Sequence, residues 1–308
     1  MTALPAAPFG RLLTAMATPM RDDGSLDLAA AARLATYLIE HGHDGLVVSG
    51  TTGEASTTSD AEKEALLTAV LEAVGDRCTV IAGAGANDTE HGRALGRLAY
   101  RAGAHAVLAT TPYYSKPTQA GVIAHVAAIA EAAQLPVMLY DVPGRTGLAL
   151  ATETIVTLAA HPQVVALKDA KGDLAATGEV RRQAPDLAVY SGADELNLPL
   201  LSLGAVGVVS VLGHLASGEL RTMIDAFDAG DIAAARAIHN ALLPAVVGLF
   251  RFASPAPVKV ALARRGLCGA QVRLPLLPAS PEQLAILQED LNRAGLPLAP
   301  TTAPGVSA

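Results

Sequence analysis

Lys168 is the residue in this sequence whose type and position most clearly suggest a reaction. It ends a short apolar run at 164–167, and a polar turn at 169–173 follows it at once. A primary amine at the end of a buried strand is a candidate Schiff-base nucleophile, because burial and nearby cations favour the neutral amine that attacks a ketone carbonyl. Taken alone, such a lysine can equally be exposed or an ion-pair partner. Its position nevertheless suggests covalent imine chemistry.

Three more polar clusters follow apolar runs. In residues 49–54 (SGTTGE), glycines let the backbone turn sharply and present N–H groups and the hydroxyls of Thr51 and Thr52 to an anionic ligand. An ordinary glycine-rich βα turn has the same composition. Residues 111–114 (TPYY) and 140–147 (YDVPGRTG) place three of the six tyrosines at strand ends. The clusters together favour a shared site.

Eight β-rich apolar runs would position these clusters, and segments of helical period such as 26–41, 60–74 and 90–102 alternate with them. The predicted strands are 12–18, 45–48, 79–82, 106–109, 137–140, 164–168, 188–191 and 206–211. Eight such units in about 220 residues predict a (β/α)8 TIM barrel of the α/β class, whose catalytic groups gather at the C-terminal strand ends. A doubly wound open sheet is the alternative, but no GxGxxG follows the first strand.

Further helical patterns at 219–228, 232–250, 256–265 and 281–294 exceed what one barrel requires. They predict an appended C-terminal helical region. We therefore expect a catalytic barrel at 10–228, the helical region at 229–296 and a mobile Pro/Thr/Ala-rich tail at 297–308.

Composition narrows the class of protein. The chain has 308 residues, 51% of them hydrophobic, which is ample for one large core. A net charge of −7 without a basic run, and 3% aromatic residues, argue against nucleic-acid binding. Cys78 and Cys268 lie far apart without zinc-ligand spacing, and no signal peptide or membrane span is apparent. We expect an unsecreted cytoplasmic protein that binds small molecules.

The remaining histidines and lysines can be judged by whether they follow the C-terminal end of a predicted strand. His41 and His43 resemble a metal pair but precede a strand, on the stability face, so we expect solvated loop histidines there. Lys63 is expected in a solvated, charged helical run and Lys259 on a late helix, and neither ends a strand. No HExxH motif or facial triad occurs, so we expect neither a metal nor a cofactor.

The ordered motifs resemble one family. GTTGE at Gly50, TPYY at Thr111, YDVPGRTG at Tyr140, ALKDA at Ala166, SGAD at Ser191, GVVSV at Gly207 and PAPVK at Pro255 are similar to those of the pyruvate-dependent class I aldolases that include N-acetylneuraminate lyase and dihydrodipicolinate synthase, and most to the latter branch. The likeness runs from about residue 10 to about residue 296.

The resemblance implies roles for individual residues. Lys168 would form the imine with pyruvate, Tyr140 would move protons, and Thr51 would relay them to Tyr114, which in the family enters the neighbouring subunit's site. Thr51 and Thr52 would hold the pyruvate carboxylate. Two further positions, Gly192 and Val209, match pocket-lining residues. A homo-oligomer follows, a tetramer built as a dimer of dimers.

Arg145 distinguishes the branches of the family, because its planar guanidinium can bind a second carboxylate through two parallel hydrogen bonds. The resemblance implies condensation of pyruvate with L-aspartate 4-semialdehyde to 4-hydroxy-tetrahydrodipicolinate, in diaminopimelate and lysine synthesis. A lyase that cleaves a 2-keto-3-deoxy sugar acid is the alternative enzyme. A regulatory barrel without turnover is the alternative of another class, since fold alone never establishes function.

Two departures from the family pattern bear on regulation and geometry. Lysine-inhibited members carry histidines and an acidic residue where this chain has Asp60, Lys63 and His91, although Asn87 and Tyr113 are kept. We therefore expect weak or absent lysine feedback. Asp141 replaces a frequent asparagine and is expected to be tolerated, with an effect on the orientation of Arg145.

Overall fold

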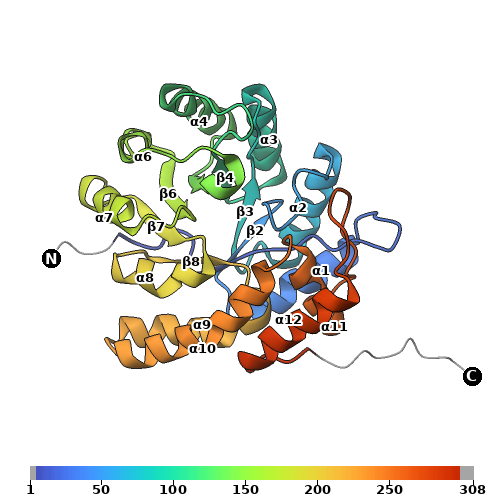
Figure 1. Ribbon diagram of the computed structural model, residues 1–308. Helices are drawn as coiled ribbons and strands as arrows, with labels where there is room; N and C mark the ends of the chain where they lie inside the picture. Colours follow the sequence, from blue (N-terminus) through green and yellow to red (C-terminus); the bar gives the residue numbers. More distant parts are fainter. Residues whose placement is uncertain (1–4, 299–308) are drawn as a thin grey trace, which may run out of the picture.

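The computed structural model describes residues 5–298, in which eight parallel strands close into a barrel (Figure 1). The predicted TIM barrel is thereby confirmed. The strands are β1 (Leu12–Ala15), β2 (Gly45–Val48), β3 (Thr79–Gly83), β4 (Ala106–Thr110), β5 (Val137–Asp141), β6 (Val164–Asp169), β7 (Ala188–Ser191) and β8 (Gly207–Ser210). Closure occurs between β1 and β8, where Leu13 pairs with Val209.

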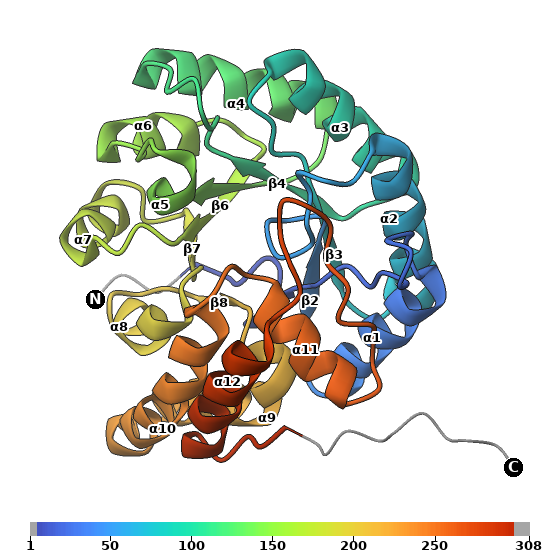
Figure 2. The ribbon, with the colours of Figure 1, turned by 45° about the vertical axis from the view of Figure 1, so that its right-hand side comes forward.

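Helices surround the barrel, and the last three extend beyond it (Figures 1 and 2). The helices are α1 (Leu28–Glu40), α2 (Asp60–Val74), α3 (Thr89–Ala102), α4 (Gln119–Ala133), α5 (Pro143–Thr146), α6 (Thr152–Ala159), α7 (Leu174–Gln183), η1 (Asp194–Leu196), α8 (Asn197–Ser202), α9 (Gly213–Asp228), α10 (Ile232–Phe250), α11 (Ala256–Arg264) and α12 (Pro281–Arg293). Side-chain caps start many of them. At α2, Ser59 and Glu62 form a reciprocal capping box.

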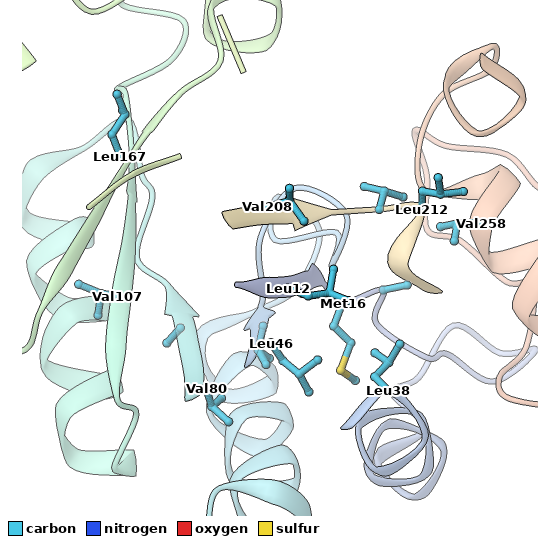
Figure 3. Packing of buried hydrophobic residues seen from close by; sticks show 14 of the residues in the cluster. Leu12, Met16, Leu38, Leu46, Val80, Val107, Leu167, Val208, Leu212 and Val258 are labelled. Atoms are coloured by element: carbon cyan, nitrogen blue, oxygen red, sulfur yellow. The ribbon is translucent and has the colours of Figure 1, made fainter. Parts of the chain in front are cut away.

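Strand alternation divides the apolar residues between two layers. Leu12 faces the helices while its neighbour Leu13 faces the barrel interior, because successive side chains point to opposite faces of a strand. The outer cluster extends into the C-terminal region, and Figure 3 shows Leu212 beside Val258 of α11. One continuous core therefore joins the barrel to the last helices. The division after residue 228 stays a prediction.

Most predicted bounds agree with the structure to within a residue or two, and the exceptions have tertiary causes. β1 ends at Ala15 rather than residue 18, and Thr18 instead donates its hydroxyl to the carbonyl of Gly53. The last barrel helix, α9, begins at Gly213 rather than residue 219. Its first turn lies next to the buried carboxylate of Asp194, which accepts from two backbone N–H groups just before the helix. The tail predicted at 297–308 lies outside the described residues from 299 onward.

Two side chains that the sequence predicts to be solvated are buried in the structure. His43 is buried, and its Nδ1 lies 2.7 Å from the carbonyl oxygen of Leu38. Lys63 is also buried, where its ammonium donates to the carbonyl of Thr58. The buried stripe of α2 consists of Lys63, Leu66, Leu67, Val70 and Val74. That helical spacing was visible in the sequence, although the charged neighbours of Lys63 suggested a solvated face.

Helix α10 is long and apolar enough to cross a membrane by length and composition alone. In the structure it packs against α9 and α12, and a third of its most apolar window is buried (33%). A helix that packs on its neighbours in a folded domain passes the same test of composition.

Two buried histidines make the stability of the fold depend on pH. His43 and His214 have pKa values that burial lowers to about 4, whereas an unfolded histidine titrates near about 6.5. Between these values the unfolded chain binds more protons, so stability falls as the pH drops from about 6.5 toward 4, by roughly 3 kcal/mol for each histidine. Asp141 has the opposite effect, because burial raises its pKa to about 6 and the folded protein therefore binds this proton more tightly than the unfolded chain. This single carboxyl group offsets only part of the effect of the two histidines.

We therefore expect the melting temperature to fall markedly between about pH 7 and about pH 5. A His43→Gln variant, which cannot titrate at this position, is expected to show a shallower pH dependence than the unsubstituted protein. A melting temperature that is flat across this range would contradict the assignment.

Candidate active site

The side chain of Lys168 enters the barrel interior near the end of β6. It shares a strand face with Ala166, which belongs to the interior cluster, because residues two apart point the same way. The residue is 5% exposed, and its Nζ lies 4.2 Å from the ring centroid of Tyr140. The register of β5 against β6 pairs the two residues directly. No residue between 5 and 298 forms an ion pair with this ammonium.

Gly192, after β7, gives the lysine side chain its space. A Cβ at this position would lie 2.7 Å from Cγ of Lys168 and 3.1 Å from the carbonyl oxygen of Asp169. Any larger residue would displace the lysine side chain or the backbone of β6. The structure thus brings Lys168, Tyr140 and Gly192 together.

A cavity of about 250 Å³ opens beside this group. It is lined by Ser49, Gly50, Thr51, Ala55, Ser56, Gly83, Gly85, Leu108, Thr110, Tyr113, Val142, Arg145 and Thr146. Lys168 and Tyr140 are not among the lining residues. Leu108 and Val142 connect the cavity to the region around Lys168. Both line the cavity, and both belong to the interior cluster that contains Tyr140 and Val209. A small organic acid fits a space of this size.

The loop after β2 forms one wall of the cavity. Two of its residues, Ser49 and Glu54, have left-handed backbone angles, with φ of 55° and 54°. Thr51 is exposed toward the cavity, whereas Thr52 is buried. Gly83 of β3 permits the close approach, because a Cβ there would lie 2.0 Å from the carbonyl oxygen of Ser49.

The predicted relay is not assembled within a single chain. Tyr114 is 88% exposed with φ of 71°, and it does not line the cavity, although its neighbour Tyr113 does. Within residues 5–298, no hydrogen bond links Thr51 to Tyr140 or to Tyr114. The role of Tyr114 therefore stays a prediction that needs a second subunit.

Asp141 lies behind the site and not in it. Its carboxyl Oδ1 accepts a hydrogen bond from the N–H of Leu150 at 3.2 Å, and burial raises its pKa to about 6. The side chain is 1% exposed and holds the end of the loop that carries Arg145. An orienting effect on Arg145 would thus be exerted through the backbone of this loop.

Several contributors to the site had no signal in the sequence. Gly85 and Thr110 line the cavity but belong to none of the polar clusters identified in the sequence. Among residues 5–298 no cluster of three or more His, Cys, Asp or Glu side chains could hold a metal ion. Burial raises the pKa of both Cys78 and Cys268 to about 11, so neither is a reactive thiolate near neutral pH.

Comparisons with known proteins agree with this geometry. Residues 8–294 match the model of the Dihydrodipicolinate synthetase family. A 4-hydroxy-tetrahydrodipicolinate synthase of Acidothermus cellulolyticus is 56% identical over 294 residues, which cover 96% of this chain and 95% of that protein. The dihydrodipicolinate synthase structure from Bacillus anthracis has a TM-score of 0.90 at 44% identity, covering 92% and 98% of the two chains. The one from Cyanidioschyzon merolae, with lysine bound, has a TM-score of 0.92 at 42% identity, covering 94% and 100%.

Proposed function

The chain belongs to the Dihydrodipicolinate synthetase family, and from that premise we infer that it condenses pyruvate with L-aspartate 4-semialdehyde to 4-hydroxy-tetrahydrodipicolinate. It is a lyase of the class I, Schiff-base-forming aldolase type in diaminopimelate and lysine biosynthesis. The observation that carries the chemical part of this inference is the position of Lys168 at a strand end, 5% exposed, with Nζ 4.2 Å from the Tyr140 ring centroid.

The reaction begins at Lys168. Its neutral amine attacks C2 of pyruvate, and loss of water from the carbinolamine gives a protonated imine. The imine is an electron sink, so a methyl proton leaves and an enamine forms. The enamine carbon attacks the aldehyde carbon of the second substrate, which makes the new carbon–carbon bond. The amino group of that substrate then displaces Lys168 as the ring of the product closes.

Proton transfers accompany each of these steps, and we assign them to Tyr140. Tyr140 pairs with Lys168 across β5 and β6, and Nζ of Lys168 lies 4.2 Å from its ring centroid, and this proximity supports the assignment. Thr51 and Tyr114 would continue the relay, and the exposure of Tyr114 on the single chain is compatible with insertion into a neighbouring subunit. The proposed assembly is a tetramer, a dimer of dimers, in the cytoplasm, and the proposed reaction requires no cofactor or metal.

Pyruvate would lie between Lys168 and the loop after β2. Thr51 and Thr52 would hold its carboxylate with hydroxyl and backbone N–H donors. Gly192 and Val209 would shape the pocket around its methyl group. The exposure of Thr51 to the cavity supports this placement.

Arg145 lines the cavity and would grip the carboxylate of the semialdehyde. We expect Arg145→Ala to lower kcat/KM for the aldehyde by about 10- to 100-fold, the cost of one charge-assisted hydrogen-bonding group, and to leave the pyruvate KM nearly unchanged. Steady-state kinetics with each substrate varied in turn measures both. Arg182→Ala, on the exposed side of α7, is the matched control. An unchanged aldehyde dependence would remove Arg145 from this role.

Feedback inhibition by lysine is expected to be weak or absent. The carboxylate of Asp60 is already engaged, since it lies 3.0 Å from Nε2 of His91 and 3.7 Å from Nζ of Lys63. The ammonium of Lys63 would also repel the side chain of a lysine ligand. An activity assay across rising lysine concentration tests this, and inhibition at micromolar lysine would contradict it.

A further inference from the structure

The loop after β2 is held from outside the barrel by a buried ion pair. Glu54 of this loop has an Oε1 that accepts from Nζ of Lys259 at 2.7 Å, and the two side chains are 1% and 0% exposed. Lys259 lies on α11, 205 residues away in the sequence. Removing one partner of such a pair leaves an uncompensated buried charge, which is strongly unfavourable.

A second contact from the same region completes the binding of this carboxylate. The backbone N–H of Arg273 donates to Oε2 of Glu54 at 3.0 Å. The guanidinium of Arg273 donates in turn to the carbonyls of Gly24 and Thr57 and to the carboxylate of Glu62. Figure 2 shows the segment after α11 passing near β2, in agreement with these contacts. The C-terminal region thus fixes both the loop and its flanks.

The loop itself is in a conformation that needs such support. Ser49 and Glu54 are both left-handed, a strained conformation for residues with a side chain, and such strain persists only where surrounding contacts over-determine it. From the segment after β1, the hydroxyl of Thr18 donates to the carbonyl of Gly53 at 2.7 Å. Between the two strained residues lie Thr51 and Thr52, the proposed partners of the pyruvate carboxylate.

We propose that Glu54 and Lys259 are positioning residues for pyruvate: their buried pair lets the C-terminal helical region set the geometry of Thr51 and Thr52. The proposal rests on the proposed function. The C-terminal helical region would then contribute to the binding of pyruvate, the first substrate. The second substrate, which is assigned to Arg145 on the loop after β5, depends on a different part of the structure.

The test separates substrate binding from stability. Lys259→Met removes the cation while keeping a long apolar side chain. We expect the pyruvate KM to rise by about tenfold or more, because small misplacements of binding groups have large kinetic effects. Because Thr51 also belongs to the proposed proton relay, kcat should fall too, while the aldehyde KM changes by less than about twofold. Arg251→Met is the matched control. It breaks the pair with Asp290, whose carboxylate is also buried in the C-terminal region but does not touch the loop.

A double variant, Glu54→Gln with Lys259→Met, decides the question if the single variant fails to fold, since it leaves no charge buried. We expect it to fold and to keep the raised pyruvate KM. A double variant with the pyruvate KM of the unsubstituted protein would overturn the proposal, as would an equal rise in the Arg251→Met control. Borohydride trapping of the unsubstituted protein with pyruvate keeps the two claims apart, because failure to label Lys168 there would refute the proposed function itself.

Discussion

A Lys168→Met variant is expected to lose condensation by about 10⁴-fold or more, because removing the nucleophile of a covalent mechanism abolishes the low-barrier path. The substitution keeps a side chain of similar length in the interior space beside Gly192, so the fold should survive. Borohydride reduction with pyruvate should label the unsubstituted protein at Lys168 and leave the variant unlabelled. Peptide mass spectrometry reads the label directly.

Lys171 provides the control for this experiment. It lies just after the same strand, and its ammonium donates to the carbonyl of Leu150 at 3.2 Å. Lys171→Met should still be labelled at Lys168 and should still turn over. A Lys168→Met protein that remains labelled, or that keeps condensation within about tenfold of the unsubstituted protein, would contradict the imine mechanism.

Tyr140→Phe is expected to lower kcat by about 10²- to 10³-fold, within the usual range for loss of a general acid–base group. The phenyl ring keeps its packing in the interior cluster and against the ammonium of Lys168, so only the hydroxyl is lost. Labelling with borohydride should still occur, although more slowly, because the amine remains in place. Steady-state and single-turnover kinetics together separate the two effects.

Tyr190 offers a matched tyrosine on the other side of the lysine. The register of β6 against β7 pairs it with Lys168, but its hydroxyl accepts from the N–H of Phe9 at 3.1 Å. Tyr190→Phe should therefore cost about 1 kcal/mol of stability and leave kcat nearly unchanged. Equal kinetic losses in the two variants would argue against a proton-transfer role for Tyr140.

The sequence predicted the barrel well because its strands are buried on both faces. A parallel strand of this kind is a short continuous apolar run, and turn residues separate the runs clearly. The four-residue helix α5 was not predicted, since it is too short for any helical period. The start of α9 depends on the carboxylate of Asp194, a contact that no local pattern encodes.

Chemistry was easier to predict than the contacts that position it. Lys168 was identified from its place at a strand end and the role of Tyr140 from the family resemblance, and the register of β5 and β6 brings the two together. Lys259 was set aside because it does not end a strand. Its partner Glu54 is 205 residues away, and only the folded chain shows that they meet. Long-range ion pairs of this kind leave no periodic signal in a sequence.

Turnover with pyruvate plus L-aspartate 4-semialdehyde, set against cleavage of 2-keto-3-deoxygluconate by the same preparation, tests the central claim most directly. The account predicts rapid condensation and negligible cleavage of the sugar acid. Rapid cleavage without condensation would contradict it. Lys168 and Tyr140 would then keep their chemical roles, but the assignment of Arg145 to a second carboxylate would be wrong.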